Sequence, residues 1–534
     1  MLAAAWIGLA VLVRLATTAG NAQHAGWHLL VELAGLWLAF TVAVVAIRRV
    51  PARRAVPILV VGGVALQLVA MASPPQLTDD FYRYAWDGRV QAAGISPYRY
   101  PPTDPALAAL RTPWLFPPGC TRISTAGTSA TGTVTACTRL NHPDSPTIYP
   151  PVAQAEFFVV HEVTRPLGPD GGGARTWQLL AALLATATTL VLVRILRRHG
   201  DPRQALLWAW CPTVVLECGG NAHVDALSSL LVVLALAESA LAASAIATSP
   251  IAQSSVATVR AGGVRRRIVA AGVLAGAGIA TKLLPVLVLP AMLAPVPGPR
   301  SGRVAWAGWL RGRGVLLLAA AGAVALAYLP HVLAAGSAVL GFLPGYVPEE
   351  GYDGSSRFPL LRLWLPHAAT PAVGFALIAG TAFLVARRTD PRRPWTGAMV
   401  LVGVTFAVLG ITYPWYALLL VPLVALDGRG RWLGLAAAGY PGYLADANGL
   451  AFTPTVAAGY ALALLAAGAG EIVTRRRAGR PGSAIASNPA TPTGSATPAG
   501  PATPPGPEQS PPSCSAGSCS CASPAPHPAA RTGG

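Results

Sequence analysis

Charged residues are scarce in this sequence. Aspartate, glutamate, lysine and arginine make up 11% of its 534 residues, whereas a soluble globular chain carries about a quarter. The acidic residues number 21, and Lys282 is the only lysine among 39 lysines and arginines. So low a charge content argues against a soluble protein of this length.

The sequence also lacks several motifs that would assign an enzyme class directly. It has no Walker loop, no Rossmann glycine pattern and no His-Glu-x-x-His zinc pattern. Nucleotide hydrolysis on the cytoplasmic side therefore has no recognisable machinery.

Apolar residues dominate what is present. They make up 53% of the chain, and the mean hydropathy is +0.50. Apolar runs of about 20 residues recur, each long enough to cross a bilayer as a helix. Because lipid-exposed backbone must satisfy its own hydrogen bonds, we predict an all-α polytopic membrane protein with about 13 or 14 transmembrane helices.

The net charge of +18 comes mainly from arginine clusters between the apolar runs. This is the pattern of cytoplasmic loops under the positive-inside rule, so we expect contact with anionic lipid heads and no nucleic-acid partner. The clusters include Arg48-Arg49, Arg53-Arg54, Arg197-Arg198, Arg265 to Arg267, Arg387-Arg388 and Arg475 to Arg477. With these inside, the N-terminus is cytoplasmic. The spans are then expected near 2–19, 27–47, 56–73, 175–196, 204–219, 223–247, 314–333, 371–386, 396–412, 415–426, 433–446 and 452–473.

Between the spans, a large external loop of about residues 74–174 is expected, in which Val152 to Val163 forms a helix on the membrane surface. A second external loop covers about 334–370. Residues 268–297 are interrupted by Lys282 and Pro285 and are expected to form a hairpin of two short helices. Residues 1–477 make up the membrane domain, and 478–534 a disordered cytoplasmic tail rich in Pro, Ala, Ser and Thr.

Two adjacent acidic residues, Asp79 and Asp80, stand where the third span emerges into the large external loop. A carboxylate at a membrane boundary suits a general base acting on a hydroxyl near a lipid phosphate. A solvated loop start would also explain the charges, but not the density of aromatic residues that follows. The chain continues with Tyr82, Arg83, Tyr84, Trp86, Asp87 and Arg89.

A second polar cluster ends the same loop and contains Asn141, His142 and Tyr149. These side chains can hydrogen-bond sugar hydroxyls. A proline-rich turn that re-enters the membrane explains them equally well.

Polar residues inside membrane segments are costly, so each is a functional candidate. Glu217, Asn221, His223 and Asp225 cluster where two spans meet, although a solvated loop end there would carry little cost. Lys282 interrupts an apolar segment and is a candidate phosphate ligand, with a snorkelling side chain as the alternative. Arg14 and Glu32 are expected to pair between the first two spans.

The cysteines fall into three groups. Cys120 and Cys137 both lie in the large external loop, where an oxidising environment favours a disulfide between them. Cys211 and Cys218 are seven residues apart on one expected helix and cannot bond to each other. Cys514, Cys519 and Cys521 lie in the tail.

Four segments together resemble the polyprenol-phosphate-sugar-dependent glycosyltransferases of the GT-C fold, in particular actinobacterial mannosyltransferases and glycosyltransferase family 87. The resemblance extends over about residues 1–475. The segments are Thr78 to Val90 with Gly94 to Tyr98, Thr147 to Gln154, Gly220 to Ala226 and Lys282 to Pro285. The stretch from Thr121 to Thr138 has no place in the family pattern.

The resemblance implies a reaction on the outer face of the plasma membrane. A polyprenyl monophosphate carrier would donate the sugar, mannose by resemblance, to a glycolipid or glycan acceptor of the cell envelope. An acidic residue acts as base with inversion at the anomeric carbon; Asp80 matches the motif best and Asp79 also fits. Arg83, Arg89 and Lys282 match motif positions for phosphate-binding cations, whereas Arg357 rests only on its place in the second loop. No cofactor is implied with certainty, and a divalent cation is left open.

The alternative is a polytopic transporter or a flippase for lipid-linked sugars, without transferase activity. Transporters usually contain repeated halves with helix breaks at matching positions. The sequence has no such repeat, and its large external loop is unusual for that class. We therefore favour the glycosyltransferase.

Overall fold

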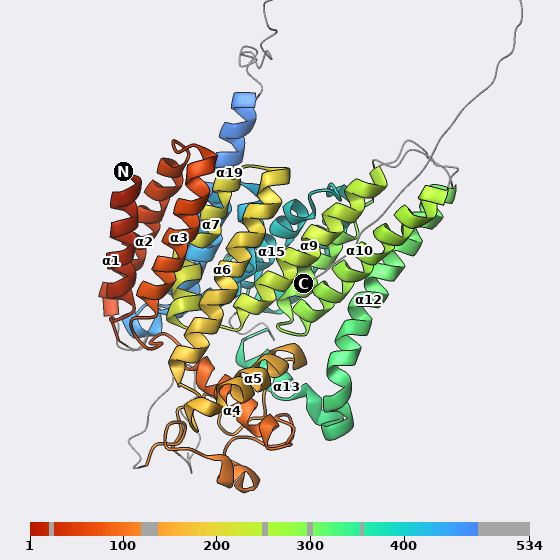
Figure 1. The fold of residues 1–534 in the computed structure, drawn as a ribbon. Helices are drawn as coiled ribbons and strands as arrows, with labels where there is room; N and C mark the ends of the chain where they lie inside the picture. The colour runs from red at the N-terminus through yellow and green to blue at the C-terminus, as the bar shows by residue number, and fades with distance from the viewer. Residues whose placement is uncertain (21–25, 119–136, 248–254, 296–302, 353–356, 479–534) are drawn as a thin grey trace, which may run out of the picture. The chain divides into compact units, whose positions relative to one another are not determined.

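The computed structural model describes residues 1–20, 26–118, 137–247, 255–295, 303–352 and 357–478. Within these ranges the chain forms helices and no strands (Figure 1). The chain divides into two units, Met1–Arg477 and Ala478–Gly534. Almost all of the second unit lies outside the described residues, so the disordered tail stays a prediction.

Seven helical segments of the described chain are long and apolar enough to cross a membrane. The prediction of an all-α polytopic membrane protein is therefore confirmed. These segments contain α2 (Gly26–Ile47), α3 (Ala52–Ala70), α6 (Ala174–His199), α9 (Asp225–Ala247), α12 (Arg303–Ala335), α14 (Thr370–Arg388) and α19 (Phe452–Ala478). Shorter apolar helices are α1 (Leu2–Ala16), α15 (Pro394–Leu409) and the segment Pro414–Asp427, which contains α16 (Leu420–Asp427).

Several other predicted spans are broken into short helices. The segment expected near 204–219 consists of a 3-10 turn (Pro202–Ala205), α7 (Leu206–Ala209), α8 (Pro212–Val214) and a π-helix (Val215–Gly220). Pro212 causes the main break, because it forces Cys211 into an extended conformation with ψ 128°. The expectation of one continuous helix carrying both cysteines is wrong, although Cys211 and Cys218 are indeed free thiols.

The predicted hairpin at 268–297 has unequal arms. Its first arm is the long helix α10 (Ser255–Ile279), which ends in a turn at Ala280 and Thr281 before Lys282. The second arm is a 3-10 turn (Leu284–Val288) followed by α11 (Leu289–Met292). Pro285 and Pro290 lack the backbone donor that a regular helix needs, so this arm stays irregular.

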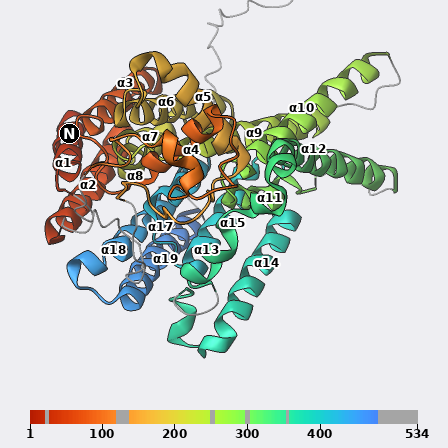
Figure 2. The ribbon, with the colours of Figure 1, turned by 90° about the horizontal axis from the view of Figure 1, so that it is seen from below.

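The remaining short helices near the C-terminal end are α17 (Gly434–Ala437) and α18 (Gly439–Tyr443). The segments predicted to be external contain α4 (Asp80–Ala92), α5 (Pro151–Thr164) and α13 (Leu343–Glu349), together with short 3-10 turns. The helix expected over Val152 to Val163 corresponds to α5. Figure 1 shows α4, α5 and α13 together below the long helices, and in the view from below α4 and α5 lie over the centre of the bundle (Figure 2).

Close backbone contacts require glycine at two positions. A Cβ atom at Gly62 would lie 2.5 Å from the ring of Trp210, whose indole nitrogen donates to Leu59 O. A Cβ atom at Gly88 would lie 2.3 Å from the carbonyl oxygen of Phe157. The first glycine brings α3 against the broken segment, and the second brings α4 against α5.

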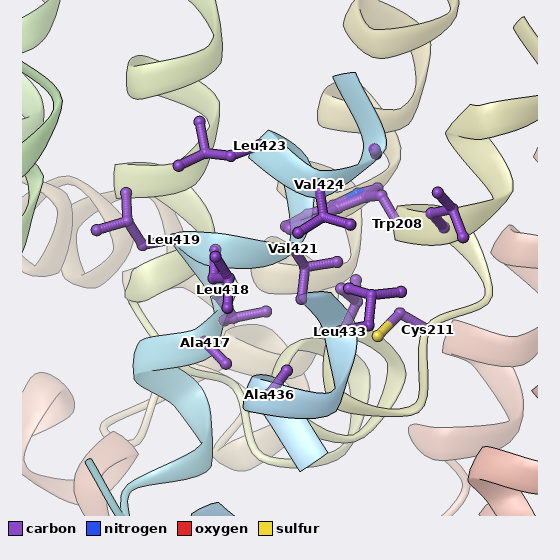
Figure 3. Close-up of a cluster of buried hydrophobic side chains, with 14 of the residues drawn as sticks. Trp208, Cys211, Ala417, Leu418, Leu419, Val421, Leu423, Val424, Leu433 and Ala436 are labelled. Atoms are coloured by element: carbon purple, nitrogen blue, oxygen red, sulfur yellow. The ribbon is translucent and has the colours of Figure 1, made fainter. Parts of the chain in front are cut away.

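The broken segments pack on one another to form the apolar core. Figure 3 shows Val421 and Val424 of α16 in one cluster with Trp208 and Cys211, together with Leu418 from the 3-10 turn before α16. Trp208 is fully buried and its indole nitrogen donates to Ala185 O in α6. This core fixes the inner ends of the segments that carry the polar residues described next.

The expected pair between Arg14 and Glu32 does not form. Arg14 stands in the last turn of α1, and its Nη1 donates to Ser73 Oγ at 2.9 Å. Because the guanidinium reaches the residues that follow α3, it does not turn toward α2.

Candidate active site

Asp79 and Asp80 form the beginning of α4. Asp79 is the N-cap residue, Asp80 is the first residue of the helix, and the Asp80 amide donates to Thr78 Oγ1 at 3.2 Å. Negative side chains at this end are stabilised by the helix dipole. The position of the two carboxylates therefore follows from where the helix starts.

Both carboxylates face a cavity of about 560 Å³. The cavity lies where the two loops predicted to be external meet the broken segments around Lys282 and Tyr413–Tyr416. Its lining includes Asp79, Asp80, Tyr82, Arg83, Arg139, Asn141, His142, Tyr149, Lys282, Leu283, Leu284, Tyr346, Glu349, Glu350, Tyr352, Tyr413, Trp415, Tyr416 and Tyr443.

A single amide holds the two carboxylates together. Asn141 Nδ2 donates to Asp80 Oδ1 at 2.7 Å and to Asp79 Oδ1 at 3.1 Å. The motif residues at the two ends of the large loop are thus joined at the cavity wall. This arrangement leaves Asp80 with a defined orientation and room for a further donor on its cavity side.

Lys282 lies on the same cavity wall and has a carboxylate partner. Its Nζ lies 3.4 Å from Asp225 Oδ2, and 5.1 and 5.3 Å from the ring centroids of Tyr149 and Tyr416. The cation is therefore enclosed by aromatic faces, which attract it electrostatically. Tyr149 itself stays neutral, since burial, and then the charge of Asp80, raises the pKa of its phenol.

His223 lies behind Asp80 and does not line the cavity. Its side chain is fully buried, and its Nδ1 lies 3.7 Å from Asp80 Oδ2. The ring stacks on Trp415 with 4.3 Å between the ring centroids. His223 is thus near the candidate base Asp80, and Asp225 is near Lys282. Neither His223 nor Asp225 lines the cavity itself.

Arg83 contributes to the cavity and also braces the loop. Its Nε donates to Asp87 Oδ1 at 3.1 Å, and its other nitrogens donate to His142 O at 3.1 Å and Ser145 O at 3.0 Å. Asp87 is buried and also accepts from Thr147 and Gln154. Asp87 therefore holds neighbouring side chains in place and does not line the cavity.

Trp86 and Arg89 are not brought to the cavity. Trp86 packs in a separate apolar cluster with Val90 and Leu107. Arg89 donates to Pro169 O at 2.8 Å on the far side of α4. Trp86 and Arg89 were predicted to contact substrate, but neither side chain lines the cavity.

Arg357 is likewise turned away from the cavity. It forms a buried ion pair with Glu350, and its Nη1 donates to Gly410 O at 3.2 Å. Glu350 lines the cavity whereas Arg357 does not. The arginine thus fixes the second external loop against the end of α15.

The two external loops also touch through His142 and Glu349, whose Nε2 and Oε1 atoms lie 3.7 Å apart. The His142 backbone has φ 42°, an uncommon conformation for this residue, and its ring packs on Phe342. The contact joins the loops beside the cavity.

Sequence reasoning missed most of the aromatic lining and Arg139. The hydroxyls of Tyr346 and Tyr416 lie 2.8 Å apart, linking the second loop to the segment after α15. For Tyr416, the sequence does contain a signal, which is the aromatic run Tyr413-Pro414-Trp415-Tyr416 at the end of an apolar segment. A run of this kind marks a candidate, but only tertiary contacts assign it to the cavity.

Two further predictions concern cysteines and metals. Cys137 is disulfide-bonded, whereas Cys120 lies outside the described residues, so their pairing stays a prediction. Among the side chains that the structure describes, no group of three or more His, Cys, Asp or Glu residues is arranged to hold a metal ion.

Over the described residues, the fold and the cavity define an all-helical polytopic membrane protein with a polar, aromatic site beside the loops predicted to be external. No protein-family model matches the chain, and no curated protein does. One similar solved structure is the oligosaccharyltransferase of Archaeoglobus fulgidus tethered with an acceptor peptide, at 14% identity and a TM-score of 0.30. The match covers 60% of this chain and 46% of that protein. A similarity this low carries no argument about fold or activity.

Proposed function

We propose that this protein is a GT-C-type glycosyltransferase of the membrane. It transfers a sugar from a polyprenyl monophosphate carrier to a glycolipid or glycan acceptor of the cell envelope, on the outer face of the plasma membrane. The observation that carries the proposal is that a carboxylate pair and the only lysine of the chain line one cavity. The first suits deprotonation of an acceptor hydroxyl, and the second suits a departing phosphate.

In this reaction Asp80 takes the proton of the acceptor hydroxyl. The hydroxyl oxygen attacks the anomeric carbon, and the bond from that carbon to the phosphate oxygen breaks on the opposite face. The electron pair leaves with the phosphate, so the configuration is inverted. Lys282, with Arg83 and Arg139 on the same lining, stabilises the charge that develops there.

A lipid carrier suits the surroundings of Lys282. The next residue, Leu283, lines the cavity although its side chain is 48% exposed. Val286, three residues further along the chain, is also 48% exposed. A phosphate at Lys282 would thus have its hydrocarbon chain beside an apolar, lipid-facing surface.

Mannose is the sugar that the motif resemblance implies. The aromatic lining fits a carbohydrate in general, because sugar faces pack on aromatic rings while hydroxyls bond Asn, Tyr and carboxylate groups. The resemblance alone distinguishes mannose from other hexoses.

The test measures transfer from radiolabelled polyprenyl-phosphate mannose to lipid acceptors in membranes containing the protein. We expect Asp80→Asn to lower kcat by about 100-fold or more. Asp144→Asn is the matched control, because Asp144 lies in the same loop, bonds Thr103 and does not line the cavity. Transfer at the native rate by both Asp79→Asn and Asp80→Asn would reject the proposed chemistry. Movement of the lipid-linked sugar across the membrane without transfer would favour a flippase.

A further inference from the structure

A buried row of polar side chains continues behind Asp80, away from the cavity. His223 has no exposed surface; its Nδ1 lies 3.7 Å from Asp80 Oδ2 and its Nε2 lies 3.2 Å from Glu217 Oε2. Neither ring nitrogen forms a well-aligned hydrogen bond, so charge rather than bond geometry dominates these contacts. One imidazole thus stands between two carboxylates.

Glu217 is held firmly at the far end of this row. Tyr440 OH donates to Glu217 Oε1 at 2.7 Å, and Asn221 Nδ2 donates to Glu217 Oε2 at 3.1 Å. The side chain of Glu217 is 2% exposed. With a donor on each of its oxygens, the Glu217 carboxyl group is fixed in place.

The charges around His223 do not balance if the imidazole is neutral. Among the described side chains, His223 is the only basic group within ion-pair distance of Asp80 and of Glu217, since Lys282 pairs with Asp225. Buried charges without partners are costly, and protonation of His223 supplies the second cation. The face of Trp415, stacked on the ring at an interplanar angle of 19°, also favours an imidazolium.

Other titratable groups near His223 do not replace this cation. Glu156 and Tyr84 line a small pocket together with His223. Burial, with a further contribution from the charge of Asp225, raises the pKa of Glu156 to about 8. Burial likewise raises the pKa of Tyr84, so both groups are neutral at neutral pH. Among the described residues, the charged groups beside His223 are thus the carboxylates of Asp80, Glu217 and Asp225, and Asp225 pairs with Lys282. Asp80 itself also has the hydroxyl of Tyr84 at 3.5 Å and the carboxylate of Asp79, which shares the amide of Asn141.

We propose that His223 is a positioning residue that carries a positive charge and keeps Asp80 ionised as the base. This inference rests on the proposed transferase reaction. His223 lies on the Oδ2 side of Asp80, where Tyr84 OH also donates at 3.5 Å. Oδ1 accepts from Asn141 and has a second lone pair for the acceptor hydroxyl. His223 neither gives nor receives a proton during transfer. The proton goes from the acceptor to Asp80, and the electron pair goes to the leaving phosphate.

The test is the pH dependence of kcat for sugar transfer by the full-length protein. In His223→Gln, Asp80 loses its cation and is protonated at higher pH, so the acid limb moves up by about one pH unit. In Glu217→Gln, a competing negative charge is lost and the acid limb moves to lower pH. The two variants therefore shift in opposite directions, with the KM for the donor changed less than about twofold in each.

His199→Gln is the matched control. His199, the last residue of α6, also packs on a tryptophan, Trp395, but it does not line the cavity. We expect its pH profile to be native. Unchanged acid limbs in both test variants, or an equal loss of kcat at every pH, would assign His223 a merely structural role. If His223→Gln fails to fold by size-exclusion chromatography, Glu217→Gln decides alone, by a shift to lower pH or by none.

The native protein and Asp80→Asn are measured in the same assay. Absence of transfer by the native protein would reject the proposed function and this inference together. Native transfer that Asp80→Asn abolishes, with unshifted His223 and Glu217 variants, would reject only the role of His223.

Discussion

Lys282 Nζ lies 3.4 Å from Asp225 Oδ2, so the only lysine of the chain already has an anionic partner beside the cavity. A phosphate that binds Lys282 shares this cation with Asp225. The lysine is thus held in place before the donor arrives, and its remaining donors are free to face the cavity.

Replacement of Lys282 should chiefly weaken use of the donor. We expect Lys282→Ala to raise the KM for polyprenyl-phosphate sugar by about tenfold or more, since a charge-assisted contact with phosphate is lost. Lys282→Arg retains the charge and should lose less. Steady-state kinetics with varied donor measure both variants, and native donor kinetics in Lys282→Ala would return the residue to a structural role.

The carboxyl of Glu156 should make the stability of the protein depend on pH. Because the folded protein raises the pKa of Glu156 from 4.5 to about 8, it binds this proton more tightly than the unfolded chain. The resulting stabilisation is complete below about pH 4.5 and is lost as the pH rises through about 8. Its size is on the order of 1–2 kcal/mol after allowance for partial exposure.

Glu156→Gln imitates the protonated side chain and should remove this dependence. Thermal unfolding in detergent is measured at pH 6 and at pH 9. Between these two pH values, we expect Tm to fall less in the variant than in the native protein. Glu162→Gln on the same helix is the control, because Glu162 is partly exposed and pairs with Arg165. Parallel curves for the native protein and Glu156→Gln would contradict the prediction.

The contact between α4 and α5 should tolerate no side chain at Gly88. A Cβ atom there would lie 2.3 Å from Phe157 O, so Gly88→Ala must separate the helices and should cost about 2 kcal/mol or more. Gly263→Ala is the control, because nothing lies within 4 Å of its added Cβ atom. Its thermal stability should stay native or rise slightly. Equal Tm values for the two variants would contradict the packing described here.

The predicted orientation can be tested with two exposed arginines. In a background whose tail cysteines are replaced by serine, Arg99→Cys should react with a membrane-impermeant maleimide on intact cells. Arg197→Cys, in the last turn of α6, should react only after permeabilisation. The opposite pattern would place the cavity on the cytoplasmic side.

Asp80 and Lys282 were predicted as site residues because both are rare residue types set in apolar or aromatic surroundings, and both line the cavity. Arg89 was misplaced because the segment was treated as a loop. It is nine residues after Asp80 in α4, or 2.5 turns at about 3.6 residues per turn, so it points from the opposite side of the helix. The helix period alone would have separated the two residues.

Other parts of the site depend on contacts that no local pattern contains. His223 and Glu217 are close in the sequence, but their place behind Asp80 follows from the breaks at Pro212 and in the π-helix Val215–Gly220. Arg357 was predicted as a further phosphate-binding cation from its place in the second loop alone. The neighbouring Glu350 binds it instead, and only the folded loop decides between a partner within the chain and a substrate.

Leu283 is half exposed directly beside Lys282, and this has a consequence for how donor use is measured. If the carrier tail stays in the bilayer while its phosphate reaches Lys282, the protein responds to the number of carriers per area of membrane, not per volume of solution. Added lipid or detergent would then dilute the donor at constant total amount. An apparent KM in molar units would rise with added detergent, whereas one expressed as a mole fraction would stay constant.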